Sequence, residues 1–187
     1  MAEVPETEGK KGRLLRLMLG AAVLVGSGAG ATIGAVHFGL VDQAAEAADT
    51  APKLLKKGDA DPYAPPSKKD AVESVDGEGG SEYRTSYFSF EEPFTSNLKD
   101  SPALVQVSLA ASTRRDGRVL LWLGKHELAA RSAILAELAD TPETHVYSLE
   151  GKQDLQRRLT KAINDVLTRT EGFGGIDDVY FRGFLVQ

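Results

Sequence analysis

Residues 17–41 read LMLGAAVLVGSGAGATIGAVHFGLV, an uncharged apolar run that determines the layout of the whole chain. About 25 residues at about 1.5 Å per residue give roughly 37 Å of helix, enough to cross a hydrocarbon core of about 30 Å. Basic side chains precede the run, whereas Asp42 and Glu46 follow it. By the positive-inside rule, we predict a cytoplasmic basic tail at 1–16, a single transmembrane helix at 17–41, and the rest of the chain on the far side of the membrane.

A cleaved signal peptide is the alternative interpretation of this run. The apolar region of a signal peptide is about 7–15 residues long and ends at a small-x-small site. Ala45-Glu46-Ala47 resembles such a site, but the run itself is longer than a signal peptide requires. The sequence therefore favours a retained anchor.

Small residues recur on one side of the predicted membrane helix. Ala22, Gly26, Gly30 and Gly34 are spaced four residues apart. This spacing lets a second helix approach closely, so it predicts that the helix self-associates within the membrane. The alternative is that glycine and alanine are simply common in membrane-spanning helices.

The composition excludes several classes of function. The chain has 187 residues, a formal net charge of −5 and no cysteine. An acidic balance gives no electrostatic footprint for nucleic acid, so no nucleic-acid partner is predicted. The lack of cysteine excludes disulfides, thiol catalysis, iron–sulfur clusters and cysteine-ligated zinc. A folded part must therefore rely on its hydrophobic core.

The chain beyond the apolar run divides into a linker and one domain. Residues 42–82 contain prolines, glycines and mixed charges, with hardly any aromatic side chain. Such a segment cannot bury enough apolar surface to offset the entropy of ordering it. We therefore predict a flexible linker at 42–82 and a folded domain at 83–187.

Periodicity of the apolar residues predicts the first half of this domain. Residues 84–90 and 103–112 alternate between apolar and polar positions and are predicted as strands. Residues 118–138 are predicted as one long helix, with residues 119–123 as an alternative third strand. The stripe that supports the helix consists of Leu121, Leu128, Leu135 and Leu138.

The second half of the domain is predicted as a helix followed by a strand. Ser148 is a suitable N-cap for the helix, and the glycines after residue 171 end it. Residues 176–187 then form the last strand. The order strand, strand, helix, helix, strand predicts an α+β domain, in which helices pack on a small, mainly antiparallel sheet.

The last strand is apolar on both of its predicted faces. The alternation places Val179, Phe181 and Leu185 on one face and Tyr180, Phe184 and Val186 on the other. A strand of this kind is typically central in a sheet or covered on both sides, so we predict that position. The aromatic residues at both ends of the domain are interpreted as core where the first and last strands meet. The alternative is an oligomer surface.

A search for catalytic motifs finds no nucleophile elbow, phosphate-binding loop or histidine pair with metal-ligand spacing. His126 and His145 are interpreted as surface residues. The glycines at 172–175 follow a helix instead of preceding one, which is the context of a helix stop. We therefore predict that the protein is not an enzyme and holds neither a metal nor a cofactor.

Several stretches of the domain, taken in order, resemble the FliL family of flagellar basal body-associated membrane proteins. They include YFSF at 87–90, EPFT at 92–95, VQVSL at 105–109, RSAIL at 131–135 and IDDVYF at 176–181. The residues that carry the resemblance are Phe90, Pro93, Phe94, Asn97, Arg131, Ser132, Gly151, Ile163, Asn164, Val179, Tyr180, Phe181 and Gln187. Arg182-Gly183 departs from the family pattern, where a small polar and an acidic residue are usual.

The resemblance implies a bacterial inner-membrane protein with a cytoplasmic N-terminus and a periplasmic, stomatin-like domain. It also implies homo-oligomerisation, with a ring as the expected form, and association with the basal body and the MotA/MotB stator units. The implied role is an oligomeric scaffold that stabilises the stator and contributes to motility and chemotaxis. The alternative is a stomatin-like membrane scaffold that serves a non-flagellar envelope complex.

Overall fold

The computed structural model describes residues 51–64 and 72–187, and Pro52–Gln187 form one compact unit. The predicted basic tail and the predicted membrane helix at 17–41 lie outside the described residues. Within the described residues, none of the helices combines the length and the apolar character that crossing a membrane requires.

One antiparallel sheet organises the domain, and its longest strand is β4 (Leu104–Thr113). On one side of β4, β2 (Thr85–Ser89) pairs with its C-terminal half and β3 (Phe94–Asn97) with its N-terminal half. On the other side, β5 (Asp178–Val186) runs along nearly the whole strand, and β1 (Val72–Val75) extends the sheet beyond β2. The predicted α+β class with an antiparallel sheet is confirmed, although β1 and β3 were not predicted.

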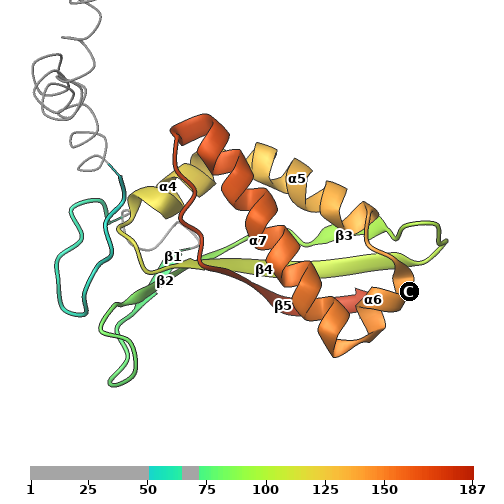
Figure 1. The fold of residues 1–187 in the computed structure, drawn as a ribbon, viewed down its shortest axis with the longest axis horizontal. Helices are drawn as coiled ribbons and strands as arrows, with labels where there is room; N and C mark the ends of the chain where they lie inside the picture. Colours follow the sequence, from blue (N-terminus) through green and yellow to red (C-terminus); the bar gives the residue numbers. More distant parts are fainter. Residues whose placement is uncertain (1–50, 65–71) are drawn as a thin grey trace, which may run out of the picture. The chain divides into compact units, whose positions relative to one another are not determined.

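Three helices lie on the same face of this sheet (Figure 1). They are α4 (Arg118–Lys125), α5 (Glu127–Ala139) and α7 (Leu149–Glu171), and a short helix, α6 (Glu143–Tyr147), precedes α7. The core forms where the apolar stripe of α7 meets the inner face of β4, because each element buries the face that its periodicity predicts. The buried residues that show this are Val105, Val107, Leu109, Leu155, Leu159 and Ile163.

Both ends of α7 form as the sequence predicts. The Ser148 hydroxyl accepts a hydrogen bond of 3.0 Å from the backbone N–H of Gly151, which satisfies one of the free donors of the first turn. At the other end, Gly172 has φ +79°, the left-handed conformation that stops a helix. The exact match follows because each capping motif acts locally on its own turn.

The predicted single helix at 118–138 is two helices, α4 and α5, which meet at His126. His126 has non-helical backbone angles, and its side chain forms a 2.7 Å hydrogen bond with Glu171 at the end of α7. The predicted leucine stripe is wrong at Leu128, which is 85% exposed, and at Leu135, which is 36% exposed, whereas Leu138 is buried as predicted. The residues of α5 that are buried are Ala130, Ile134 and Leu138.

The folded domain begins before the predicted boundary at residue 83. Residues 52–64 and β1, both within the predicted flexible linker, pack on the domain. Leu55 is buried, and single bridges join Leu54 to Arg115 and Lys56 to Tyr83. Composition did not reveal this packing because the contacts are made mainly by backbone groups and by residues distant in sequence.

The last strand lies at the side of the sheet and not at its centre, because among the described strands β5 pairs with β4 alone. The alternation of side chains along β5 shifts by one residue at a β-bulge. Ser108 pairs with Gly183 and Leu109 with Phe181, so Arg182 is the extra residue. The pairs on the helix-covered face are Val179 with Ala111, Phe181 with Leu109, Phe184 with Val107, and Val186 with Val105. The predicted division of these residues between two faces is therefore wrong beyond Arg182.

Deletion of Arg182 should destabilise the domain much more than Arg182→Ala. Without the extra residue, the parts of β5 before and after position 182 cannot both keep their present pairing with β4. Whichever part shifts by one residue turns its apolar side chains away from the helices. We expect the free energy of unfolding to fall by about 2–4 kcal/mol, on the scale of exposing two apolar side chains. Chemical denaturation of the full-length protein in mild detergent measures this. Equal midpoints for the deletion and the alanine variant would contradict the proposed role of the bulge.

Candidate interaction surface

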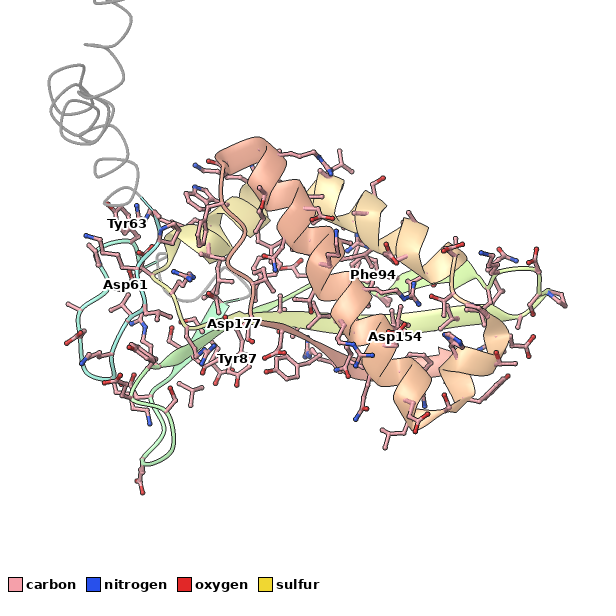
Figure 2. The ribbon with its side chains drawn as sticks, in the orientation of Figure 1. Asp61, Tyr63, Tyr87, Phe94, Asp154 and Asp177 are labelled. Carbon is pink, nitrogen blue, oxygen red and sulfur yellow. The ribbon has the colours of Figure 1, made fainter. Side chains whose placement is uncertain are left out.

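The sheet face opposite the helices is the candidate functional surface. Side chains alternate between the two faces of a strand, so the register assigns every second residue to this outer face. Figure 2 shows the contrast: Phe94 lies between the helices and the sheet, whereas Tyr87 lies on the other side. The outer-face residues from β2, β4 and β5 are Thr85, Tyr87, Ser89, Leu104, Gln106, Ser108, Ala110, Ser112, Asp178, Tyr180, Gly183 and Leu185.

Aromatic and aliphatic side chains are exposed on this outer face. The rings of Tyr87 and Tyr180 are 6.0 Å apart, and each lies on a strand that pairs with β4. Tyr180 is 39% exposed, Leu185 46% and Leu104 41%. Exposed apolar residues that occur together, with tyrosine among them, are typical of protein–protein contact surfaces.

A polar groove runs between α7 and β5, beside the outer face. It has a volume of about 720 Å³, and Tyr180 is part of its lining. The side-chain amide of Gln156, on α7, donates a 3.0 Å hydrogen bond to the carbonyl oxygen of Val179, on β5. Asp177 also lines the groove, and its carboxylate accepts a 3.0 Å hydrogen bond from the guanidinium of Arg114. This hydrogen bond raises the pKa of Arg114 above its ordinary value. The groove therefore offers hydrogen-bonding groups along the edge of the apolar surface.

Some of the residues that resemble the family stabilise the inner side of the domain. Phe90 and Phe94 are buried with their rings edge to face, 5.3 Å apart. The guanidinium carbon of Arg131 lies 4.3 Å from the centre of the Phe94 ring, and its nitrogens donate to the carbonyl oxygens of Glu92 and Pro93. Arg131, which interrupts the predicted leucine stripe, thus fixes the turn between β2 and β3 against α5.

Other family-like residues hold the ends of α7. Gly151 lies against the backbone of α6, where an added Cβ would come 2.2 Å from the carbonyl oxygen of His145. Ile163 is fully buried, as predicted. The side-chain amide of Asn164 both donates to and accepts from the backbone of Ile176, each bond being 2.9 Å long. These residues position the start of β5 relative to the helix.

The remaining predicted residues are dispersed. Asn97, Ser132 and Gln187 are exposed and lie on β3, on α5 and at the end of the chain. The predicted membrane-helix residues Ala22, Gly26, Gly30 and Gly34 lie outside the described part of the chain. Of the predicted set, Tyr180 and Asn97 lie on the outer sheet face, Asn97 as the partner of Leu104. The backbone of Gln187 also exchanges hydrogen bonds with that of Leu104. Sequence reasoning missed Leu185 as a surface residue, because the bulge at Arg182 that sets its orientation leaves no periodic signal. The exposure of Leu104 follows from the alternation along β4 but was not predicted.

The described residues contain no cluster of three or more His, Asp or Glu side chains that could hold a metal ion. His126 pairs with Glu171, and His145 lies on the short helix α6. The fold and this surface together define an α+β domain with helices on one face of an antiparallel sheet and exposed Leu104, Tyr180 and Leu185 on the other.

Comparison with known proteins agrees with this class. The family model described as "Flagellar basal body-associated protein FliL" matches residues 87–187, and the chain belongs to this family. The chain is also 28% identical over 101 residues to "Flagellar protein FliL" of Aquifex aeolicus (strain VF5). The alignment covers 54% of this chain and 60% of that relative. The description of the family associates its members with the flagellar basal body.

Arg131→Ala should lower the free energy of unfolding by about 1–2 kcal/mol, because it removes the cation–π contact with Phe94 together with packing of the side-chain stem. Arg131→Lys should recover less than half of this loss, since an ammonium group cannot stack on the ring and reach both carbonyl oxygens. Thermal or chemical denaturation of the full-length protein measures both effects. Glu92→Gln is the matched control and should change stability by less than about 0.5 kcal/mol, because the Glu92 carboxylate is exposed.

Proposed function

We propose that this protein is a single-pass inner-membrane component of the flagellar basal body that supports the MotA/MotB stator units. In this proposal the basic tail at 1–16 is cytoplasmic, residues 17–41 span the membrane, and the domain described above lies in the periplasm. Copies of the protein associate into a closed ring, which acts as a scaffold and contributes to motility. Family membership and the apolar run at 17–41 support this role.

The outer face of the sheet carries the proposal of a scaffold. The helices cover the inner face, so Leu104, Tyr180 and Leu185 remain available to a protein partner. A closed ring needs a contact surface on each copy, and the exposed apolar side chains of the outer sheet face would provide part of one.

Two weak contacts suffice for assembly of a membrane-anchored protein. The spacing of Gly26, Gly30 and Gly34 favours association of the membrane helices, and the outer sheet face favours association of the domains. Once one of these contacts forms, the other becomes effectively intramolecular, which raises its effective concentration. The proposal therefore predicts that damage to either contact weakens assembly.

Leu185→Glu should weaken assembly of the protein in membranes about tenfold or more, because it places an unpaired charge in the proposed contact surface. Chemical cross-linking of the full-length protein in membranes measures assembly, and spreading on soft agar measures motility. The stability of the domain should change little, since Leu185 lies on the side of the sheet away from the core.

Leu128→Glu is the matched control for this experiment. Leu128 is also an exposed leucine, but it lies on α5 in the helix layer. We expect Leu128→Glu to assemble and to support motility as the unaltered protein does. If both variants assemble normally, the outer sheet face is not the contact surface. If both fail equally, the effect comes from charge and not from the position on the sheet.

Gly30→Leu should weaken assembly through the membrane helix without unfolding the domain, because a leucine side chain prevents close helix approach. The control is Gly28→Leu, which adds the same side chain two residues away, on the opposite side of the predicted helix. Cross-linking in membranes compares the two variants. If the unaltered protein is monomeric both in membranes and in mild detergent, the scaffold proposal fails, and an adaptor that binds one stator unit replaces it.

A further inference from the structure

Residues 52–64, which we call the strap, insert between two strands that diverge. The pairing of β2 with β4 ends where Ser86 meets Thr113. Beyond that point the strap fills the gap: Leu55 N–H donates to Arg114 C=O at 3.0 Å on one side, and Arg84 N–H donates to Leu55 C=O at 3.1 Å on the other. The strap thus joins the sheet through isolated bridges at Leu54 and Lys56, although it lies outside the residues that match the family model.

Two buried carboxylates hold the strap at the start of α4. Asp61, on the strap, has a side chain only 2% exposed; it accepts a 2.9 Å hydrogen bond from the Gly117 N–H and pairs with Arg84. Asp116, on the domain, accepts a 2.7 Å hydrogen bond from the Lys53 N–H of the strap. Figure 2 shows Asp61 and Tyr63 together at this end of the molecule.

Gly117 is adapted to the docked strap. Its φ of −60° is open to any residue, so backbone conformation does not require a glycine here. An added Cβ would, however, lie 2.2 Å from the carbonyl oxygen of Tyr63 and 3.1 Å from the Asp61 carboxylate. The absence of a side chain at residue 117 therefore leaves the space through which the strap backbone passes.

The strap is held mainly by polar contacts. Leu55 is its buried large apolar side chain, and it is separate from the main core cluster, whereas Leu54 and Tyr63 are exposed. Segments with few buried apolar contacts open at a lower free energy than the core of the same domain. The strap therefore has the features of a segment that can separate from the domain while the core stays folded.

The polar contacts are also incompletely satisfied. The Nε of Arg84 is buried and has no acceptor among the described residues, a group that water would satisfy if the strap opened. Burial by itself would raise the pKa of Asp116, but hydrogen bonds from Arg118 and from the Lys53 backbone outweigh it and hold the pKa below its ordinary value. The Asp116 carboxylate is therefore charged at neutral pH, as its contact with the strap requires.

We propose that the strap is a releasable segment, which docks between β2 and β4 through Asp61 and Asp116 and detaches while the rest of the domain remains folded. Docking fixes the point at which the chain leaves the domain, beside Arg115, whose guanidinium donates to Pro52 C=O at 2.7 Å. Release frees about 13 residues, which span at most about 45 Å when extended. If residues 17–41 anchor the chain as proposed above, release lengthens the tether between the membrane and the domain.

Hydrogen exchange of the full-length protein in mild detergent tests this proposal. The amides of Leu55 and Lys57 donate to the domain, and the amide of Gly117 donates to the strap, so all three report on docking. We expect peptides that contain them to exchange at least tenfold faster than peptides from the β4–β5 pair, yet more slowly than an unstructured chain. The result does not depend on membrane insertion, so it stands or falls separately from the proposed function.

Substitutions make the test specific to the strap. Asp61→Asn should speed exchange in the strap about tenfold and leave β4–β5 unchanged, whereas Asp59→Asn, on an exposed strap residue, should have no effect. Gly117→Ala should act like Asp61→Asn, because the new methyl group displaces Tyr63. Its control is Gly79→Ala, where an added Cβ meets no neighbouring atom.

A covalent lock completes the test, because the chain has no cysteine of its own. Lys56 and Tyr83 face each other across an antiparallel bridge, a spacing that a disulfide spans. The oxidised Lys56→Cys/Tyr83→Cys variant should slow strap exchange to the rate of β4–β5, and reduction should restore the fast rate. The proposal is overturned if strap and core exchange at one rate in the unaltered protein, or if Asp61→Asn speeds both equally.

Discussion

The contact between strand β4 and helix α7 is the constraint on which the rest of the domain depends. Val105, Val107 and Leu109 are fully buried in the core cluster that also contains the apolar stripe of α7, and their strand has a neighbour on both sides. With no cysteine for a covalent brace, this apolar layer supplies the main stabilisation of the fold. The position of every other strand is set by its register with β4, directly or through β2, and so is the composition of the two sheet faces.

The sequence could predict the elements that carry a long local period. Among the described elements, β4 is the longest strand and α7 the longest helix, and their buried residues, such as Leu109 and Ile163, agree with the periodicity. The failures have one common cause, which is that contacts between distant residues override the local pattern. The His126–Glu171 contact accompanies a break between two helices, and the bulge at Arg182 moves Phe184 and Val186 onto the inner face.

The candidate surface was less predictable than the fold. The family resemblance correctly identified the domain, but most of the residues that carry it are buried or support turns, as Phe94 and Asn164 do. A surface that binds a partner is defined by which side chains the packing leaves exposed, and no repeating signal in the chain encodes that. The strap illustrates the same limit, because Asp61 contacts Gly117, 56 residues away.

The bulge at Arg182 also affects the solubility of the domain. In the described structure β5 has no partner strand along the edge that faces away from β4. A continuous free edge of this kind can pair with strands of other molecules and lead to aggregation. An extra residue interrupts the regular row of backbone donors and acceptors, and the exposed arginine adds charge at that point. The same residue that orders the apolar face of β5 thereby protects its edge, so neighbouring copies of the domain can come close together without merging their sheets.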